Sequence, residues 1–290
     1  MGVLDEPFRG AWAVAAGYIT EWQLRKDFEQ VFPGVHVRKG VVLNAVGRAQ
    51  AAVHWSKGDA VVVGRSAAAM HETPWIDAQQ AVELGSARHL KPPNGIRIYR
   101  DTYEPHECCD IDGFRVTTPA RTAFDIGRRL PRDEAIPIID ALCRATNLLP
   151  REIAALAAEH AGARGVRRIA QLVPLIDPGA ESIQESLTRL LLIDDGLPPP
   201  RTQVLVRDPY TGSRIYIDMG WEEWRVGVEY DGRQHWDDAA QRRRDIDRLE
   251  ALRALDWRII RLSASHLYRR PHLILDRIRE ALRARGAQLD

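Results

Sequence analysis

The spacing of apolar residues divides the last third of the chain into a regular series of elements. Ile183, Leu187 and Leu190 recur at helical spacing and predict an amphipathic helix over 182–193. Short alternating segments predict strands at 203–207, 214–219, 224–230 and 257–262. Two further segments predict a long charged helix over 238–255 and a closing helix over 271–285. The predicted order is therefore α-β-β-β-α-β-α.

The first 178 residues have a mixed pattern. Thr20 is a good N-cap and predicts a helix over 22–31, and Ala-rich spacing predicts a second helix over 44–55. Alternating apolar residues predict strands at 35–37, 81–84, 96–99 and 114–116. Thr118 and Pro119 suit the N-cap and first position of another helix. A mixed α/β protein is predicted.

A domain boundary is predicted at Asp177-Pro178-Gly179, where Pro and Gly interrupt one helical segment before the next begins. The chain of 290 residues is long enough for two domains, which we place at 1–178 and 179–290.

Composition excludes several classes of protein. Lys+Arg number 41 and Asp+Glu 40, so a nucleic-acid surface would have to be a local patch. The 3 cysteines do not form the framework of a disulfide-rich secreted domain. No apolar segment approaches the roughly 18–20 residues that span a bilayer. We expect a cytoplasmic protein without a membrane partner.

Three carboxylates suggest chemistry in the second domain. On a strand, Asp218 shares a face with Tyr216, while Glu229 and Asp231 share a face of the next strand. If the apolar faces of these strands lie together, the three carboxylates lie on one side. Opposed Cβ atoms would be roughly 5 Å apart, which favours a hard divalent cation such as Mg²⁺ or Mn²⁺. The alternative is an ordinary strand that ends in a turn.

The surrounding motifs resemble the very-short-patch-repair-endonuclease-like branch of the PD-(D/E)XK nuclease superfamily. The matching segments are Ser182-Ile-Gln-Glu185, Gln203, Tyr216-Ile-Asp218, Val226-Gly-Val-Glu-Tyr-Asp-Gly-Arg-Gln-His235, Arg244-Asp-Ile-Asp-Arg248 and Trp257-Arg-Ile-Ile-Arg-Leu262. The resemblance implies a restriction-endonuclease-like α-β-β-β-α-β core. It also implies metal-dependent hydrolysis of phosphodiester bonds.

The resemblance assigns roles to individual residues. Asp218 and Glu229 would be metal ligands, and Asp231 would complete the acidic face. Glu185 would approach from the first helix, although Ser182-x-x-Glu185 is equally a capping box. Gln203, Arg244 and Arg248 are expected to contact nucleic acid, the two arginines either there or on a solvated helix face.

The chain departs from the superfamily at its lysine. The motif places Lys two residues after the second acid, where this sequence has Asp231, and no lysine follows Lys91. His235 is a candidate general acid or base, or else an ordinary surface histidine.

The first domain resembles AbiEi-like antitoxins. The matching segments are Gly17-Tyr-Ile-Thr20, Pro33-Gly-Val35, Asp59-Ala-Val-Val-Val-Gly64, Ser66-Ala-Ala68 and Asp112-Gly-Phe-Arg-Val-Thr-Thr-Pro-Ala-Arg-Thr122. The resemblance implies an α+β domain with a reduced winged-helix-like start. If this domain binds DNA, its backbone contacts would be Arg25, Lys26, Arg38 and Lys39, which could equally be ordinary surface charges.

The leading hypothesis is a Mg²⁺- or Mn²⁺-dependent endonuclease that acts on nucleic acid, with DNA favoured over RNA. A non-catalytic, antitoxin-like DNA-binding regulator is the alternative, and an RNA-directed nuclease toxin is the third hypothesis. The sequence leaves the oligomeric state open, including a homodimer.

Overall fold

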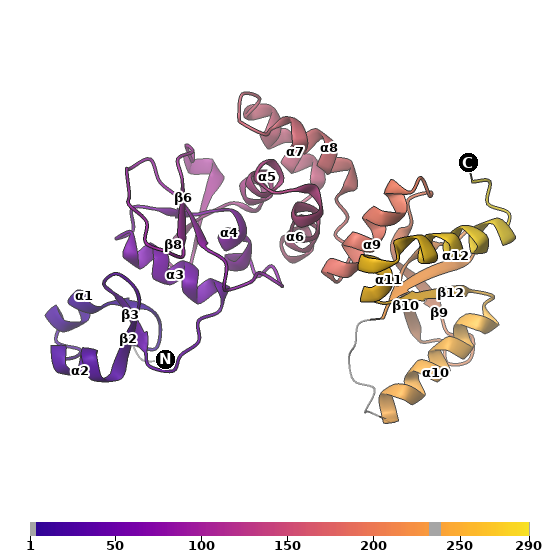
Figure 1. The fold of residues 1–290 in the computed structure, drawn as a ribbon, viewed down its shortest axis with the longest axis horizontal. Coiled ribbons are helices and arrows are strands. Elements are labelled where there is room, and N and C mark those ends of the chain that lie inside the picture. The colour runs from indigo at the N-terminus through magenta and orange to yellow at the C-terminus, as the bar shows by residue number, and fades with distance from the viewer. Residues whose placement is uncertain (1–3, 232–238, 290) are drawn as a thin grey trace. The chain divides into compact units, whose positions relative to one another are not determined.

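The structure of the chain is a computed structural model that describes residues 4–231 and 239–289, with the side chains of 239–244 left out. The chain forms two compact units, residues 1–176 (unit 1) and residues 177–290 (unit 2) (Figure 1).

No helix in the described ranges has the length and apolar character that a membrane span requires.

Unit 1 begins with short helices and a small sheet in the strand order β1-β3-β2. The elements are β1 (Phe8–Arg9), α1 (Gly10–Ala15), α2 (Glu21–Asp27), β2 (Phe28–Phe32) and β3 (Val35–Arg38). Thr20 caps α2 as expected, since its hydroxyl accepts from the N–H of Gln23. The helix predicted over 22–31 ends early, however, because Phe28 and Phe32 are buried and β2 pairs with β3.

A five-stranded sheet with the order β6-β5-β4-β8-β7 follows. Its strands are β4 (Val61–Val62), β5 (Val82–Gly85), β6 (Ile96–Tyr99), β7 (Cys108–Ile111) and β8 (Phe114–Thr117). The helices α3 (Ala45–Trp55) and α4 (Gly64–Met70) pack against it through Ala52, Ala67 and Met70. The predicted strands and the helix over 44–55 are therefore confirmed.

The rest of unit 1 is helical. The elements are η1 (Pro105–Glu107), α5 (Pro119–Arg129), α6 (Arg132–Thr146), α7 (Pro150–Glu159), α8 (Arg167–Leu172) and η2 (Val173–Leu175). Helix α5 begins as predicted, with Thr118 as N-cap and Pro119 in the first turn. It contacts α4, α6, α7 and α8 and so forms the centre of this region.

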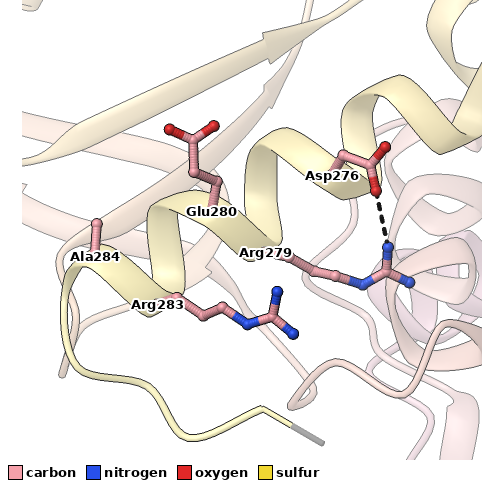
Figure 2. Close-up of a pocket in the computed structure, with 5 residues that line it drawn as sticks. All are labelled: Asp276, Arg279, Glu280, Arg283 and Ala284. Atoms are coloured by element: carbon pink, nitrogen blue, oxygen red, sulfur yellow. Dashed lines mark hydrogen bonds and ion pairs between the residues drawn. The ribbon is translucent and has the colours of Figure 1, made fainter.

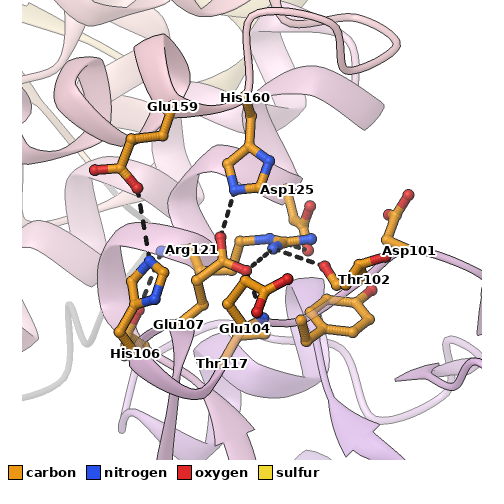
Figure 3. A network of polar contacts seen from close by, with 12 residues as sticks. Asp101, Thr102, Glu104, His106, Glu107, Thr117, Arg121, Asp125, Glu159 and His160 are labelled. Carbon is orange, nitrogen blue, oxygen red and sulfur yellow. Dashed lines mark hydrogen bonds and ion pairs between the residues drawn. The ribbon is translucent and has the colours of Figure 1, made fainter.

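A buried ion network ties α5 to the sheet (Figure 3). The carboxylate of Glu107 accepts from Arg121 and lies 2.5 Å from the Nε2 of His160. Asp125 pairs with Arg128 at 2.8 Å and Arg129 at 3.1 Å, and the side chains of Glu107 and Asp125 are fully buried. Opposite charges therefore meet inside unit 1 and offset the cost of their burial.

Unit 2 contains a four-stranded sheet with the order β12-β11-β10-β9, in which only β11 and β12 are parallel. Its elements are α9 (Ile183–Asp194), β9 (Arg201–Arg207), β10 (Arg214–Trp221), β11 (Val226–Tyr230), α10 (Ala239–Ala254), β12 (Arg258–Leu262), α11 (Ala264–Arg269) and α12 (Pro271–Ala284). The predicted order is confirmed, with α11 as an additional short helix.

Helices cover both faces of this sheet (Figure 1). On one face, Ala251 and Leu252 of α10 pack with Ile215 and Ile217. On the other, residues of α9, α11 and α12 form a larger cluster with Val226 and Val228, among others. The sheet is therefore the middle layer of three, and its strand ends remain free to carry polar groups.

Candidate functional site

The candidate site lies where β10 and β11 separate. Their antiparallel pairing ends at Met219 and Val228. Beyond this pair, the N–H of Tyr230 donates to Oδ2 of Asp218 at 2.9 Å instead of to the backbone of β10. Asp218 therefore fills the opening between the two strands with its carboxylate.

The apolar faces of β10 and β11 do not lie together at Asp218, although the alternation of residues predicted that they would. Ile217 packs in the α10 cluster, whereas Val228 packs in the opposite cluster, so the apolar faces of the two strands are not shared. Met219 lies in the same cluster as Val228, so the alternation along β10 changes sides at Asp218. This irregularity in β10, and not the regular alternation of side chains along a strand, brings the two carboxylates together.

Glu229 is held by arginines. Arg248 of α10 donates to its Oε1 at 2.5 Å and its Oε2 at 3.0 Å, a bidentate geometry that fixes the carboxylate. Arg248 also donates to the carbonyl oxygen of Tyr216 at 2.7 Å. Arg261, which lies beside Glu229 in the parallel register, adds an ion pair at 3.5 Å. Sequence reasoning gave no role to Arg261, because only the strand register places it there.

Glu185 lies in the first turn of α9, where Ser182 is the N-cap. The hydroxyl of Ser182 accepts from the N–H of Glu185 at 3.1 Å, and it also donates to Oε1 at 2.9 Å. The N–H of Glu181 donates to Oε2 at 2.8 Å. This arrangement caps α9 while the buried carboxylate still acts electrostatically on Asp218.

Asp218 is the perturbed acid of the group. Burial raises its pKa, and the N–H of Tyr230 partly offsets that effect. The negative charges of Glu185 and Glu229 raise the pKa further, Arg248 lowers it, and the result is about 6. Burial together with neighbouring carboxylates is a typical cause of a raised pKa at functional sites.

Within the described ranges, no group of three or more His, Cys, Asp or Glu side chains is arranged to bind a metal ion. Mg²⁺ often uses one or two carboxylates and completes its shell with water and phosphate oxygens. Asp218 and Glu185, whose negative charges repel one another, are two candidate oxygen ligands for such an ion. Both oxygens of Glu229 accept from the cationic guanidinium of Arg248, whereas those of Glu185 accept from the neutral Ser182 hydroxyl and Glu181 N–H. Its assignment as a metal ligand stays a prediction.

The other predicted site residues are placed in different ways. Gln203 of β9 lies across from Asp218, between the pairs Ile217–Val204 and Met219–Thr202, and its φ is 47°. Such a left-handed conformation is strained for a non-glycine residue and marks candidate sites. Asp231 is exposed just after β11. His235 and the side chain of Arg244 lie outside the described residues.

The four predicted DNA contacts of the first domain have local partners. Lys39 donates to the carbonyl oxygens of Arg25 and Lys26. The ammonium of Lys26 lies 4.4 Å from the ring centroid of Trp22, and Arg38 stacks over Phe28. Their role in DNA binding stays a prediction.

A shallow depression of about 800 Å³ lies elsewhere in unit 2, along α12 (Figure 2). Asp276, Arg279, Glu280, Arg283 and Ala284 line it, and Arg279 pairs with Asp276 and Asp195. Two acids and two bases line the depression, so neither sign of charge dominates it.

Comparisons with known proteins agree with both resemblances. The family model described as the AbiEi antitoxin C-terminal domain matches residues 60–175, and the restriction-endonuclease-like model REase_MTES_1575 matches 201–282. Two uncharacterised proteins of Mycobacterium tuberculosis, from strains CDC 1551 and H37Rv, are each 30% identical over 243 residues. That alignment covers 83% of this chain and 89% of each relative. No solved structure matches the chain.

Proposed function

This chain belongs to the same family as the two mycobacterial proteins, and from that premise we propose that its C-terminal domain is an endonuclease. The proposed reaction is Mg²⁺- or Mn²⁺-dependent hydrolysis of phosphodiester bonds, with DNA as the first substrate to test. The restriction-endonuclease-like domain and the AbiEi-type domain are the features from which this proposal starts.

The observation that carries the proposal is the group of carboxylates at the separation of β10 and β11. Asp218 has a pKa near 6 because it is buried beside Glu185 and Glu229. A packed core gains nothing from carboxylates that repel one another, whereas a cation-assisted phosphate site uses them.

In the proposed mechanism, Asp218 and Glu185 would hold the divalent ion. When bound, such an ion supplies Lewis acidity and lowers the pKa of water. Glu229 would orient the attacking water or join the ligands, and Asp231 would extend the acidic face. His235 would supply or accept a proton, and Gln203 and Arg244 would contact the nucleic acid.

Arg248 is our candidate for the position of the missing lysine. Its guanidinium lies against Glu229 and lowers the pKa of Asp218. A fixed cation there would orient Glu229 and favour negative charge on a bound phosphate. This role differs from simple backbone contact, because Arg248 is already engaged within the site.

The test is a cleavage assay on plasmid, single-stranded DNA and RNA, with Mg²⁺, Mn²⁺ or EDTA. We expect cleavage that requires a metal ion and is lost in Asp218→Ala. Asp276→Ala is the matched control, since Asp276 is an exposed acid on α12. Equal cleavage by wild type and Asp218→Ala would sink the site assignment.

A non-catalytic regulator is the second candidate, and two observations favour it. Arg248 occupies both oxygens of Glu229, and the first domain matches an antitoxin family. A regulator would bind DNA without cutting any substrate under any metal condition. RNA cleavage without DNA cleavage would instead favour the third hypothesis, a toxin-like ribonuclease.

A further inference from the structure

The β9–β10 hairpin of unit 2 has one covered face and one open face. Val204, Val206, Ile215 and Ile217 pack in the cluster beneath α10. The alternate residues Leu205, Arg207, Arg214 and Tyr216 are exposed, with 45% of Leu205 and 45% of Tyr216 accessible. We call these four residues the open hairpin face.

The open hairpin face brings like charges together. Arg207 is directly opposite Arg214, and Leu205 is directly opposite Tyr216. Opposed like charges destabilise an antiparallel pair. No carboxylate in the described ranges forms an ion pair with either arginine. The arginine pair is therefore a positive site that an anionic partner would stabilise.

The open hairpin face runs along β10 toward the candidate site, where Arg248 holds Glu229 from the α10 side of the sheet. Tyr216 precedes Asp218 by two residues, or roughly 7 Å along a strand, and Arg214 by four, or roughly 13 Å. The carbonyl oxygen of Tyr216 accepts from Arg248, which holds Glu229. Further along β9, Gln203 lies across from Asp218 and has a φ of 47°. Cations, an exposed ring and the carboxylates thus follow one another along the hairpin.

We propose that the open hairpin face binds one strand of the nucleic-acid substrate as it enters the site. Arg207 and Arg214 would contact phosphates, and an unpaired base would stack on the ring of Tyr216 beside Leu205. A base within a duplex presents only its edges, so stacking selects single strands or unpaired segments. The inference rests on the proposed nuclease function and specifies its substrate class.

Binding in EDTA tests this surface without requiring cleavage. The full-length protein is titrated with a labelled single-stranded oligonucleotide and with its blunt duplex, across a range of salt. Tyr216→Ala should weaken single-strand binding by about 10- to 100-fold and leave duplex binding nearly unchanged. Tyr216→Phe keeps the ring and should bind like the wild type, which separates stacking from misfolding.

The salt dependence of binding tests the contribution of Arg207 and Arg214 separately from that of Tyr216. Combined Arg207→Gln and Arg214→Gln should reduce the slope of log affinity against log salt by about 1.4 for a single strand, at about 0.7 per contact. Arg283→Gln, an exposed arginine on α12, is the control and should leave the slope unchanged.

Several outcomes would overturn the inference. Wild-type affinity in Tyr216→Ala would do so, as would an equal loss for single strand and duplex. A change of oligomeric state in Tyr216→Ala, without a change in binding, would make the face a protein contact. Selective loss of single-strand binding in a protein that never cleaves would support the face while removing the nuclease proposal.

Discussion

Buried acids in the two units have different neighbours. In unit 1, burial would raise the pKa of Glu107, but the N–H of Glu104, His160 and Arg121 outweigh burial and lower it. Burial likewise raises the pKa of Asp101, and Arg128 and Arg129 outweigh it. In unit 2, burial and two neighbouring carboxylates raise the pKa of Asp218 to about 6.

The acids of unit 1 are paired with cations, whereas Asp218 of unit 2 lies near two further carboxylates. Glu107 and Asp101 each meet cations that lower their pKa, so their ionisation stabilises the folded state. At Asp218 ionisation destabilises the folded state, and a bound cation would reverse that effect. Protein domains tolerate such arrangements mainly at functional sites.

The largest effect is expected where the unit 1 network is broken. Arg121→Met leaves Glu107 without its arginine, although the side chain of Glu107 is fully buried. We expect the free energy of unfolding to fall by about 3–5 kcal/mol in urea titrations. Arg283→Met, at an exposed position, is the control. A loss below about 1 kcal/mol would mean that the network is not structural.

The next effect concerns cleavage in unit 2. Glu229→Gln keeps the shape of the side chain but removes the charge that Arg248 binds. Cleavage should fall by about 10²–10³-fold, which corresponds to a few kcal/mol in the transition state. DNA affinity in EDTA should hold or rise, because one charge that repels phosphate is gone. Glu222→Gln, a substitution at an exposed acid, is the control and should leave the cleavage rate unchanged. A similar fall in cleavage in this control would remove Glu229 from the mechanism.

A third effect is stabilisation by metal ions. At 100 times its dissociation constant, Mn²⁺ or Mg²⁺ should stabilise the folded protein by about 2.7 kcal/mol. Asp218→Asn should abolish most of this gain and still accept the N–H of Tyr230 through its amide oxygen. Thermal melting with and without metal measures the difference. An equal shift in both proteins would place the metal elsewhere.

The smallest effect is a pH dependence of opposite sign in the two units. Because the pKa of Asp218 rises from 3.8 to about 6 on folding, its favourable contribution is full below 3.8 and is lost as pH rises through 6. In EDTA, the free energy of unfolding of Asp218→Asn should therefore exceed that of the wild type by about 1–3 kcal/mol at pH 8. Below pH 4 the two proteins should be equally stable.

The acids of unit 1 should give the opposite dependence of stability on pH. The pKa values of Glu107 and Asp101 are lowered on folding, so their contribution is lost as pH falls through those lowered values. Urea titrations from pH 4 to 8 compare Asp218→Asn with Asp276→Asn as the control. A constant difference across this range would contradict the raised pKa of Asp218.

Features that depend on neighbouring residues follow from the amino-acid sequence alone. Thr20, Thr118 and Ser182 cap their helices as predicted, because capping involves atoms only three residues apart. The order of elements in unit 2 follows from periodicity, and both family resemblances follow from motifs.

The way in which these features combine depends on contacts between distant parts of the chain. Phe28 lies in a strand instead of a helix, because pairing with β3 overrides local preference. The side on which Asp218 lies depends on an irregularity between two strands, and the contacts of Arg248 and Arg261 with Glu229 depend on helix packing and strand register. The contact of Arg248 with Glu229 joins residues that are 19 positions apart, so no local pattern in the chain encodes it.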